Sequence, residues 1–245
     1  MRALPSVSIC APAYDEEQAI EGFLDDCWDA LEGDGARARL DYELLVVDDG
    51  SRDGTLARLE RRARDWPRLR VLEHGENKGI AAAWRTLYLA ASKRYAFLIG
   101  SDGQWRCADL WPMLDAYRRG ADVVIGVRRD KRAVYTPARR LLSAGYRLAT
   151  RALFGVDLRD AGSLKLAPRE VFAVDLVSDS VFADAERMLR AVRAGMRLDF
   201  VPCAFHPRRG GVATGARPAV VARAARDLVR TFVELRLRAD RTRPS

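Results

Sequence analysis

Residues 42–51 read YELLVVDDGS, an apolar run that ends in two adjacent carboxylates, a glycine and a serine. A short, continuously apolar run predicts a strand that is buried on both faces. Residues 55–66 follow it with helical periodicity. A buried strand, a polar turn and a helix in this order predict one β–α unit of a parallel sheet.

The same alternation continues on both sides of this unit. Further strands are predicted at residues 7–11, 70–72, 95–99, 122–127, 165–166 and 198–202. Further helices are predicted at residues 15–31, 80–93, 108–119, 138–154, 184–194 and 218–238. This order predicts an α/β fold with a Rossmann-like, mostly parallel sheet flanked by helices.

The composition excludes several classes of protein. With 245 residues, of which 49% are hydrophobic, the chain can bury a core without disulfides or zinc. It has no apolar run of the ~18–20 residues that a membrane span requires, and residues 1–8 lack the apolar core of a signal peptide. The four cysteines are far apart and are expected to be free thiols in a reducing cytosol.

The charge is uneven along the sequence. The formal net charge is +8, and residues 201–245 hold ten arginines against three acidic residues. This asymmetry indicates an anionic partner, namely a phosphate, a membrane surface or a nucleic acid. The tail has little aromatic interleaving, with Phe232 alone, so nucleic acid is not expected. The helix at 218–238 is either docked with a solvated basic face or bound to anionic lipid.

Polar turns follow the predicted strands, at residues 12–16, 48–51, 100–103 and 126–128. Because the carboxyl ends of parallel strands share one edge, these turns are expected to form a ligand site. Two adjacent carboxylates, Asp48 and Asp49, exceed what a helix cap requires. Glu16 and Glu17 either join this site or complement the dipole of the helix predicted to begin there.

A metal held by histidines is not expected, because the chain has only His74 and His206. Asp102 follows a buried strand and lies beside glycines, with Gln104 two residues on. Oxygen ligands of this kind favour Mg²⁺ or Mn²⁺, which can bridge a diphosphate.

Four motifs occur in order, namely residues 11–17 (APAYDEE), 46–55 (VVDDGSRDGT), 77–79 (NKG) and 101–104 (SDGQ). Together they resemble the family 2 glycosyltransferases of the GT-A fold. Residues 126–128 (GVR), Arg139 with Ser143, Asp160 and residues 206–211 (HPRRGG) resemble the branch of dolichyl- and polyprenyl-phosphate glycosyltransferases. The resemblance covers residues 5–216. It implies a GT-A nucleotide-diphospho-sugar transferase domain at 1–216, followed by a basic amphipathic helix and tail at 217–245.

The resemblance also implies roles for individual residues. The nucleotide base and ribose would be bound by Pro12, Tyr14, Glu16, Val46 and Asp48. The metal–diphosphate would be bound by Ser101, Asp102 and Gln104, with Asp102 and Gln104 as metal ligands. Phosphate groups of donor or acceptor would be bound by Arg128, Arg139, Ser143 and Arg208, which with Asp102 form the expected catalytic set. Arginine suits this task because its planar fork meets phosphate oxygens in pairs.

The sequence departs from the family pattern at three places. Gly100 stands where the family has the first carboxylate of Asp-x-Asp. The alternatives are a weaker Mg²⁺ or Mn²⁺ site at Asp102 and Gln104, a ligand from elsewhere, or a diverged and inactive protein. Ala213 and Thr214 replace a serine and a lysine of the loop after Arg208, and residues 160–163 (DAGS) replace the usual Ser-Gly-Phe context.

The resemblance implies an inverting glycosyltransferase that moves a sugar from a nucleotide-diphosphate sugar to a polyprenyl phosphate. Such an acceptor is already anionic near neutral pH, so no histidine base is needed. The enzyme would be cytoplasmic or peripheral on the cytosolic membrane face. One alternative is a soluble or carbohydrate hydroxyl acceptor, with Asp184 or Glu186 as base. Another is a nucleotide-sugar-binding protein without catalysis. The sugar, the base and the oligomeric state are left open.

Overall fold

The computed structural model describes residues 1–33, 40–129, 137–160, 162–206 and 218–241. They fall into two compact units, each described by itself below. Unit 1 comprises Met1–Arg129, Ser163–Ala173 and Arg197–Gly211, and unit 2 comprises Asp130–Gly162, Val174–Met196 and Val212–Ser245. The domain boundary expected between residues 216 and 217 falls on residues outside the described set and stays a prediction.

Unit 1 is built on one sheet. Its strands among the described residues are β1 (Val7–Ala13), β2 (Tyr42–Asp48), β3 (Leu69–Glu73), β4 (Tyr95–Leu98), β5 (Val123–Arg128), β6 (Lys165–Pro168) and β7 (Leu198–Cys203). Their order across the sheet is β3-β2-β1-β4-β6-β5-β7. Only β6 runs antiparallel to its neighbours within this sheet, so the mostly parallel sheet predicted from the sequence is confirmed.

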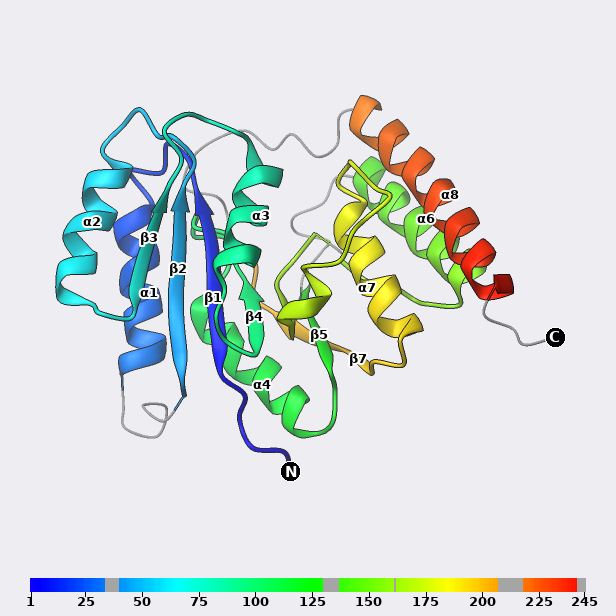
Figure 1. The fold of residues 1–245 in the computed structure, drawn as a ribbon, viewed down its shortest axis with the longest axis horizontal. Coiled ribbons are helices and arrows are strands. Elements are labelled where there is room, and N and C mark those ends of the chain that lie inside the picture. The colour runs from blue at the N-terminus through cyan, green and yellow to red at the C-terminus, as the bar shows by residue number, and fades with distance from the viewer. Residues whose placement is uncertain (34–39, 130–136, 161, 207–217, 242–245) are drawn as a thin grey trace. The chain divides into compact units, whose positions relative to one another are not determined.

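Helices cover both faces of this sheet (Figure 1). They are α1 (Ile20–Glu32), α2 (Thr55–Asp65), α3 (Ile80–Ala90) and α4 (Leu110–Arg118), with short 3₁₀ turns η1 (Cys107–Asp109) and η2 (Arg169–Val171). Apolar side chains of α1, α2 and α4 form one core with Val7, Ile9 and Ala11 of β1. Helix α3 packs against β1 and β2 with side chains outside that core, as expected for alternation along a strand.

The strand register aligns the carboxyl ends of the central strands. Val7 of β1 lies opposite both Tyr42 of β2 and Tyr95 of β4, and Ala13 lies opposite Asp48. The loops that follow β1, β2 and β4 therefore leave the sheet at the same edge. Ligands of open parallel sheets bind at this edge, so the register positions the candidate site.

A buried carboxylate joins the opposite ends of these strands. Glu43 of β2 accepts hydrogen bonds from Ser8 Oγ (2.6 Å), from Ser92 N (2.7 Å) and from Arg70 Nη1 (2.7 Å). Burial alone would raise the pKa of Glu43, but these hydrogen bonds outweigh it and lower that pKa to about 2. Glu43 is therefore a structural anion of the fold, outside the candidate site.

Helix α1 begins later than the sequence pattern predicts. The predicted start is residue 15, but the first helical residue is Ile20, and Asp15 has a φ of 50°. Backbone amides of residues 15–17 donate to side chains of Ser51, Thr55 and Asp53, which hold this segment as a loop. Glu16 and Glu17 lie in the turn just before Ile20, where Glu16 O accepts from Ala19 N (2.9 Å) and Ile20 N (2.8 Å), so the alternative that they complement the helix dipole stays a prediction.

Unit 2 contains three helices among its described residues, α6 (Pro137–Phe154), α7 (Ala183–Arg193) and α8 (Pro218–Arg241). Helices α6 and α8 meet through the rings of Phe154 and Phe232, whose centroids are 5.7 Å apart. Helices α7 and α8 are joined by Arg190 Nη2 and Glu234 Oε2 at 2.9 Å. None of the helices in the described ranges combines the length and the apolar character needed to cross a bilayer.

Candidate functional site

The loops after β1 and β2 are clasped together by side chain to backbone hydrogen bonds. Asp15 N donates to Ser51 Oγ (3.0 Å), and Arg52 N donates to Asp15 Oδ1 (2.8 Å). Glu16 N donates to Thr55 Oγ1 at 2.9 Å, which holds Glu16 at the edge of the site. Because these contacts are mutual, each loop fixes the position of the other.

Glu17 completes this clasp in a structural role. Its carboxylate accepts from Gly54 N (3.3 Å) at the start of α2 and pairs with Arg58 Nη2 at 3.0 Å. The hydrogen bond from Arg58 lowers the pKa of Glu17. Its backbone amide donates to Asp53 Oδ2 (3.0 Å), so Asp53 is also occupied within the loop.

Asp48 ends β2 with one oxygen free inside the protein. Its side chain is 1% exposed, and Oδ2 accepts a hydrogen bond from Ser51 N at 3.0 Å. Oδ1 is buried and has no hydrogen-bond partner among the described residues. A buried carboxylate oxygen without a donor is costly, so its presence indicates a ligand that supplies one.

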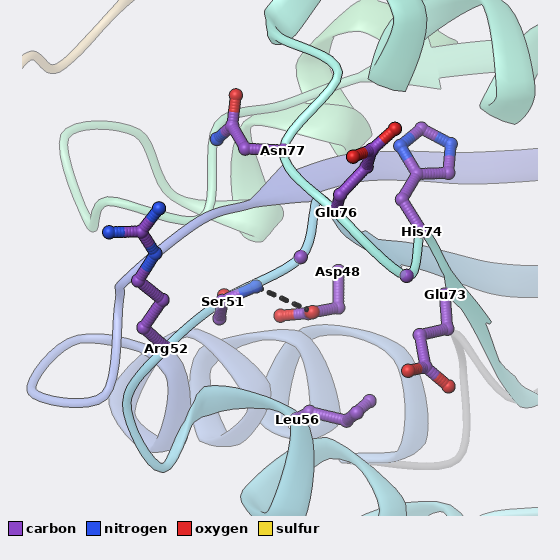
Figure 2. A pocket seen from close by; sticks show the side chains of 10 residues that line it. Asp48, Ser51, Arg52, Leu56, Glu73, His74, Glu76 and Asn77 are labelled. Atoms are coloured by element: carbon purple, nitrogen blue, oxygen red, sulfur yellow. Dashed lines mark hydrogen bonds between the residues drawn. The ribbon is translucent and has the colours of Figure 1, made fainter.

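A cavity of about 310 Å³ lies beside Asp48. Its lining comprises Ser51, Arg52 and Leu56 from the β2–α2 side and His74, Glu76 and Asn77 from the segment after β3 (Figure 2). The other lining residues are Gly50, Glu73 and Gly75. Gly50 has a φ of 69°, and a Cβ there would lie 2.4 Å from the backbone of Glu76, so this close loop crossing requires glycine.

Asp49 is used differently from Asp48, although the two are adjacent. Its Oδ1 contacts His74 Nδ1 (2.6 Å) and accepts from Lys78 N (3.0 Å), while its Oδ2 accepts from Gly79 N (2.8 Å). Burial acts to raise the pKa of Asp49, but these hydrogen bonds prevail and lower it. His74 Nε2 in turn contacts Thr86 Oγ1 at 2.9 Å. Asp49 therefore holds one wall of the cavity in place.

The loop after β4 is tied to the end of β1. Ser101 Oγ donates to the carbonyl oxygen of Pro12 at 2.8 Å, which brings together two of the predicted site residues. Asp102 is buried, and its Oδ1 accepts from Gln104 N at 3.1 Å. A Cβ built on Gly100 would lie 3.3 Å from Asp102 Oδ1, so a side chain at position 100 would point toward Asp102.

Arg128 ends β5 and stacks on two aromatic rings. Its Cζ lies 4.4 Å from the ring centroid of Phe205 and 5.1 Å from that of Trp105. These rings pack edge to face at 4.9 Å, and His206 N donates to Gln104 O at 2.9 Å. The loops after β4 and β7 thus form an aromatic platform that positions the Arg128 guanidinium.

The remaining predicted site residues lie in different surroundings. Tyr14 is exposed in the loop after β1, whereas the Val46 side chain is fully buried in the core. Ser143 is half-buried on α6 of unit 2, and Arg139 stands in the first turn of that helix. Arg208 lies outside the described residues.

The two carboxylates considered as bases for a hydroxyl acceptor lie in α7. Glu186 is fully buried and accepts from Val177 N (3.0 Å), Ser178 N (2.9 Å) and Arg190 Nε (2.7 Å). It therefore holds the segment before α7 and has no free oxygen for a substrate proton. Asp184 is half-buried, and its Oδ1 pairs with Arg187 Nη1 at 3.3 Å.

His74 and Thr86 are parts of the site that sequence reasoning did not single out. His74 directly follows β3, the neighbour of β2 at the edge of the sheet. The signal available was its place immediately after an apolar strand, in line with the other strand-end turns.

Comparisons with known proteins identify relatives of this chain. The sequence profile described as Glycosyl transferase family 2 matches residues 8–174. Glycosyltransferase AglJ of Haloferax volcanii is 30% identical over 246 aligned residues, which cover 98% of this chain and 74% of that protein. An undecaprenyl-phosphate mannosyltransferase of Micrococcus luteus is 31% identical over 69% of this chain and 74% of its own length.

A solved structure shares the fold. It is the mannosyltransferase PcManGT of Pyrobaculum calidifontis in complex with GDP-Man and Mn²⁺, with a TM-score of 0.61 and 22% identity. The match covers 99% of this chain, which spans 66% of the length of that protein. The GT-A fold expected from the resemblance is thereby confirmed.

Proposed function

The chain belongs to glycosyl transferase family 2 and is a glycosyltransferase, and on this premise we propose that it transfers a sugar from a nucleotide-diphosphate sugar to a polyprenyl phosphate with inversion. The buried, unpartnered Oδ1 of Asp48 at the end of β2 carries the donor half of this proposal. The similarity to an undecaprenyl-phosphate mannosyltransferase supports the acceptor half.

Asp48 binds the nucleotide base. Its Oδ1 is an acceptor only, so it is compatible with a donor on the base such as the ring N–H of uracil, thymine or guanine. The adjacent cavity of about 310 Å³ matches the lower size range of small-molecule sites. Pro12, Tyr14 and Glu16, in and after the end of β1, face the same edge and complete the nucleoside side of the site.

A divalent metal fits this site only when it is shared with the donor diphosphate. No group of three potential metal-binding side chains occurs among the described residues. Mg²⁺ is commonly held by one or two carboxylates together with substrate phosphates, and Asp102 with Gln104 supplies such a partial set. When bound, Mg²⁺ or Mn²⁺ would neutralise charge on the departing diphosphate. Ser101 fixes this loop against Pro12, so Asp102 needs little reorganisation.

Arg128 provides the cation for the phosphate groups. The platform of Trp105 and Phe205 orients its guanidinium, which meets phosphate oxygens with a planar fork. An oxygen of the acceptor phosphate forms a bond to the anomeric carbon. The bond from that carbon to the β-phosphate oxygen breaks, and its electron pair leaves with the nucleoside diphosphate. Arg139, Ser143 and Arg208 are proposed to contact the acceptor phosphate or the donor diphosphate.

The acceptor defines where the reaction takes place. A polyprenyl phosphate is held in a membrane by its chain, so the enzyme works as a peripheral protein at the cytosolic membrane face. The basic segment 217–245 supports an anionic membrane surface as the partner.

Transfer of a radiolabelled sugar to polyprenyl phosphate, followed by extraction of the lipid product, tests this function. Arg128→Ala should reduce transfer by at least about tenfold, because it removes a charge-assisted contact. Arg129→Ala is the matched control, because Arg129 is the exposed neighbour of Arg128. The substitution keeps the hydrogen bond that the backbone amide of residue 129 donates to Cys203 O.

Two outcomes would contradict the proposal. Equal transfer by Arg128→Ala and Arg129→Ala would remove Arg128 from the reaction. Transfer to a soluble hydroxyl acceptor with none to polyprenyl phosphate would overturn the acceptor class.

A further inference from the structure

The net charge of the chain belongs to one of its two units. Unit 2 holds 18 of the 42 lysines and arginines but only 10 of the 34 acidic residues. Unit 1 holds the other 24 basic and 24 acidic residues and is formally neutral. The whole net charge of +8 therefore lies on the unit that carries α6, α7 and α8.

Helix α6 exposes an apolar stripe. Leu141 and Leu148, seven residues apart on one side of the helix, are 76% and 70% exposed. Ala144 and Ala152 continue the same stripe at helical spacing and are also exposed. The opposite side packs inward, with Thr150 fully buried and Phe154 against Phe232. A helix on a solvated surface normally turns its polar side outward, whereas α6 turns apolar side chains outward.

Helix α8 repeats this arrangement. Its exposed side carries Ala222, Ala225, Val229 and Val233, at helical spacing. Its inward side carries Asp227 and Thr231, which are fully buried. Because α6 and α8 contact each other, the two stripes belong to one body.

Arginines without ion pairs border these stripes. Arg140, Arg151 and Arg223 are exposed, and none of them pairs with a carboxylate among the residues that the structure describes. Other arginines of unit 2 are occupied, as Arg147 is by Asp157 at 2.8 Å and Arg190 by Glu234 at 2.9 Å. Three uncompensated cations beside exposed apolar side chains favour an anionic surface with an apolar interior.

We propose that unit 2 docks on an anionic lipid bilayer through the α6 stripe and the α8 stripe together, with Arg140, Arg151 and Arg223 at the lipid headgroups. This adds α6 to the basic tail that the sequence indicates, and it rests on the proposed function only for the identity of the lipid acceptor. A second copy of the chain fits the surface poorly, because two such faces would bring their unpaired arginines together.

Sedimentation with vesicles that contain neither polyprenyl phosphate nor donor tests the docking separately from sugar transfer. The vesicles are phosphatidylcholine with or without phosphatidylglycerol. Changing Arg140, Arg151 and Arg223 together to glutamine should weaken binding to the anionic vesicles by about a hundredfold, at about fivefold for each arginine. Changing Leu141 and Leu148 together to serine should weaken it by roughly tenfold, since partly buried leucines return to water.

Unit 1 provides matched controls. Changing Arg85, Arg94 and Arg119 to glutamine removes the same charge from exposed sites of unit 1 that have no ion pair among the described residues. Leu89→Ser replaces a leucine on α3 that is 73% exposed. Both control variants should bind vesicles as the unchanged protein does, and light scattering should find each variant in the same oligomeric state.

Three results would overturn the docking surface. Equal losses in the unit 2 variants and their unit 1 controls would show that only total charge or general hydrophobicity matters. Full binding by the Leu141 and Leu148 variant would remove α6 from the surface. A dimer that this variant converts to a monomer would identify a second copy of the chain as the occupant. Sugar transfer that fails while vesicle binding follows the prediction would count against the proposed function alone.

Discussion

Replacing Asp48 with asparagine should weaken nucleoside diphosphate binding by about ten- to a hundredfold without destabilising the unliganded protein. The substitution keeps the shape of the side chain and one carbonyl oxygen, which can still accept from Ser51 N. It replaces the free Oδ1 with an amide that donates, so a ring N–H of the base meets a donor instead of an acceptor. Losing a hydrogen bond to a charged group costs about 1.5–3 kcal/mol, which sets the expected change in Kd.

The adjacent carboxylate provides the contrast. Asp49→Asn removes an acceptor from a set in which both oxygens are occupied, by His74, Lys78 and Gly79. It should lower the free energy of unfolding by about 1–3 kcal/mol, because a buried donor loses its partner. Asp48→Asn breaks no hydrogen bond within the protein and should leave the melting temperature unchanged or raised.

Titration calorimetry with UDP, GDP and TDP, together with thermal unfolding of the unliganded variants, measures both effects. Binding of every nucleotide by Asp48→Asn as tightly as by the unchanged protein would refute this role of Asp48. The role is equally refuted if Asp48→Asn destabilises the unliganded protein as much as Asp49→Asn does.

Three further predictions concern the metal, the cavity wall and acid stability. Gly100→Asp adds a carboxylate directed at Asp102 and should strengthen the dependence of nucleotide binding on Mn²⁺. Calorimetry with and without the metal measures this dependence, and an unchanged dependence would count against a metal at this position. His74→Leu leaves Asp49 without its imidazole partner and should lower the free energy of unfolding, measured with urea, by about 1–3 kcal/mol. His74→Asn should recover part of this loss, and equal stability of both variants and the unchanged protein would contradict the structural role of His74. The folded pKa of Glu43 is about 2, below its ordinary value of 4.5, so ionised Glu43 contributes up to about 3 kcal/mol to the free energy of unfolding. This contribution is present above pH 4.5 and is lost as the pH falls toward 2. Urea unfolding should find the loss in the unchanged protein and not in Glu43→Gln.

Much of unit 1 is predictable because its strands are local, apolar and followed by turn residues. The run at residues 42–48 is buried at every position, as a strand of a covered parallel sheet must be. The sequence does not determine which strands become neighbours. The insertion of the antiparallel β6 between β4 and β5 depends on pairings between distant segments, which local patterns do not encode.

The site shows the same limit at the level of single residues. Asp48 and Asp49 are identical in type and adjacent, so their sequence pattern assigns both to a ligand. Successive side chains at a strand end face opposite sides, and only the packing of His74 and the amides of residues 78 and 79 shows that Asp49 is occupied. The late start of α1 has a similar cause, since contacts with the distant residues 51–55 hold residues 15–17 in a loop that the local sequence does not encode.

The charge pattern was recognisable in the sequence, but its boundary was not. Counting along the chain places most of the excess at residues 201–245, whereas the folded chain assigns all of it to unit 2, which also contains α6. The exposed stripe of α6 could not be distinguished from a buried stripe by periodicity, because both have the same helical spacing.

Backbone hydrogen exchange with and without a saturating nucleoside diphosphate tests most directly whether the strand-end loops of unit 1 bind the donor. The nucleotide that raises the melting temperature most is the one to use. The expected result is slower exchange in the loops after β1, β2, β3 and β4, around residues 14–17, 49–52, 75–79 and 101–104. Slower exchange confined to unit 2, or none in these loops at saturation, would contradict the proposed donor site.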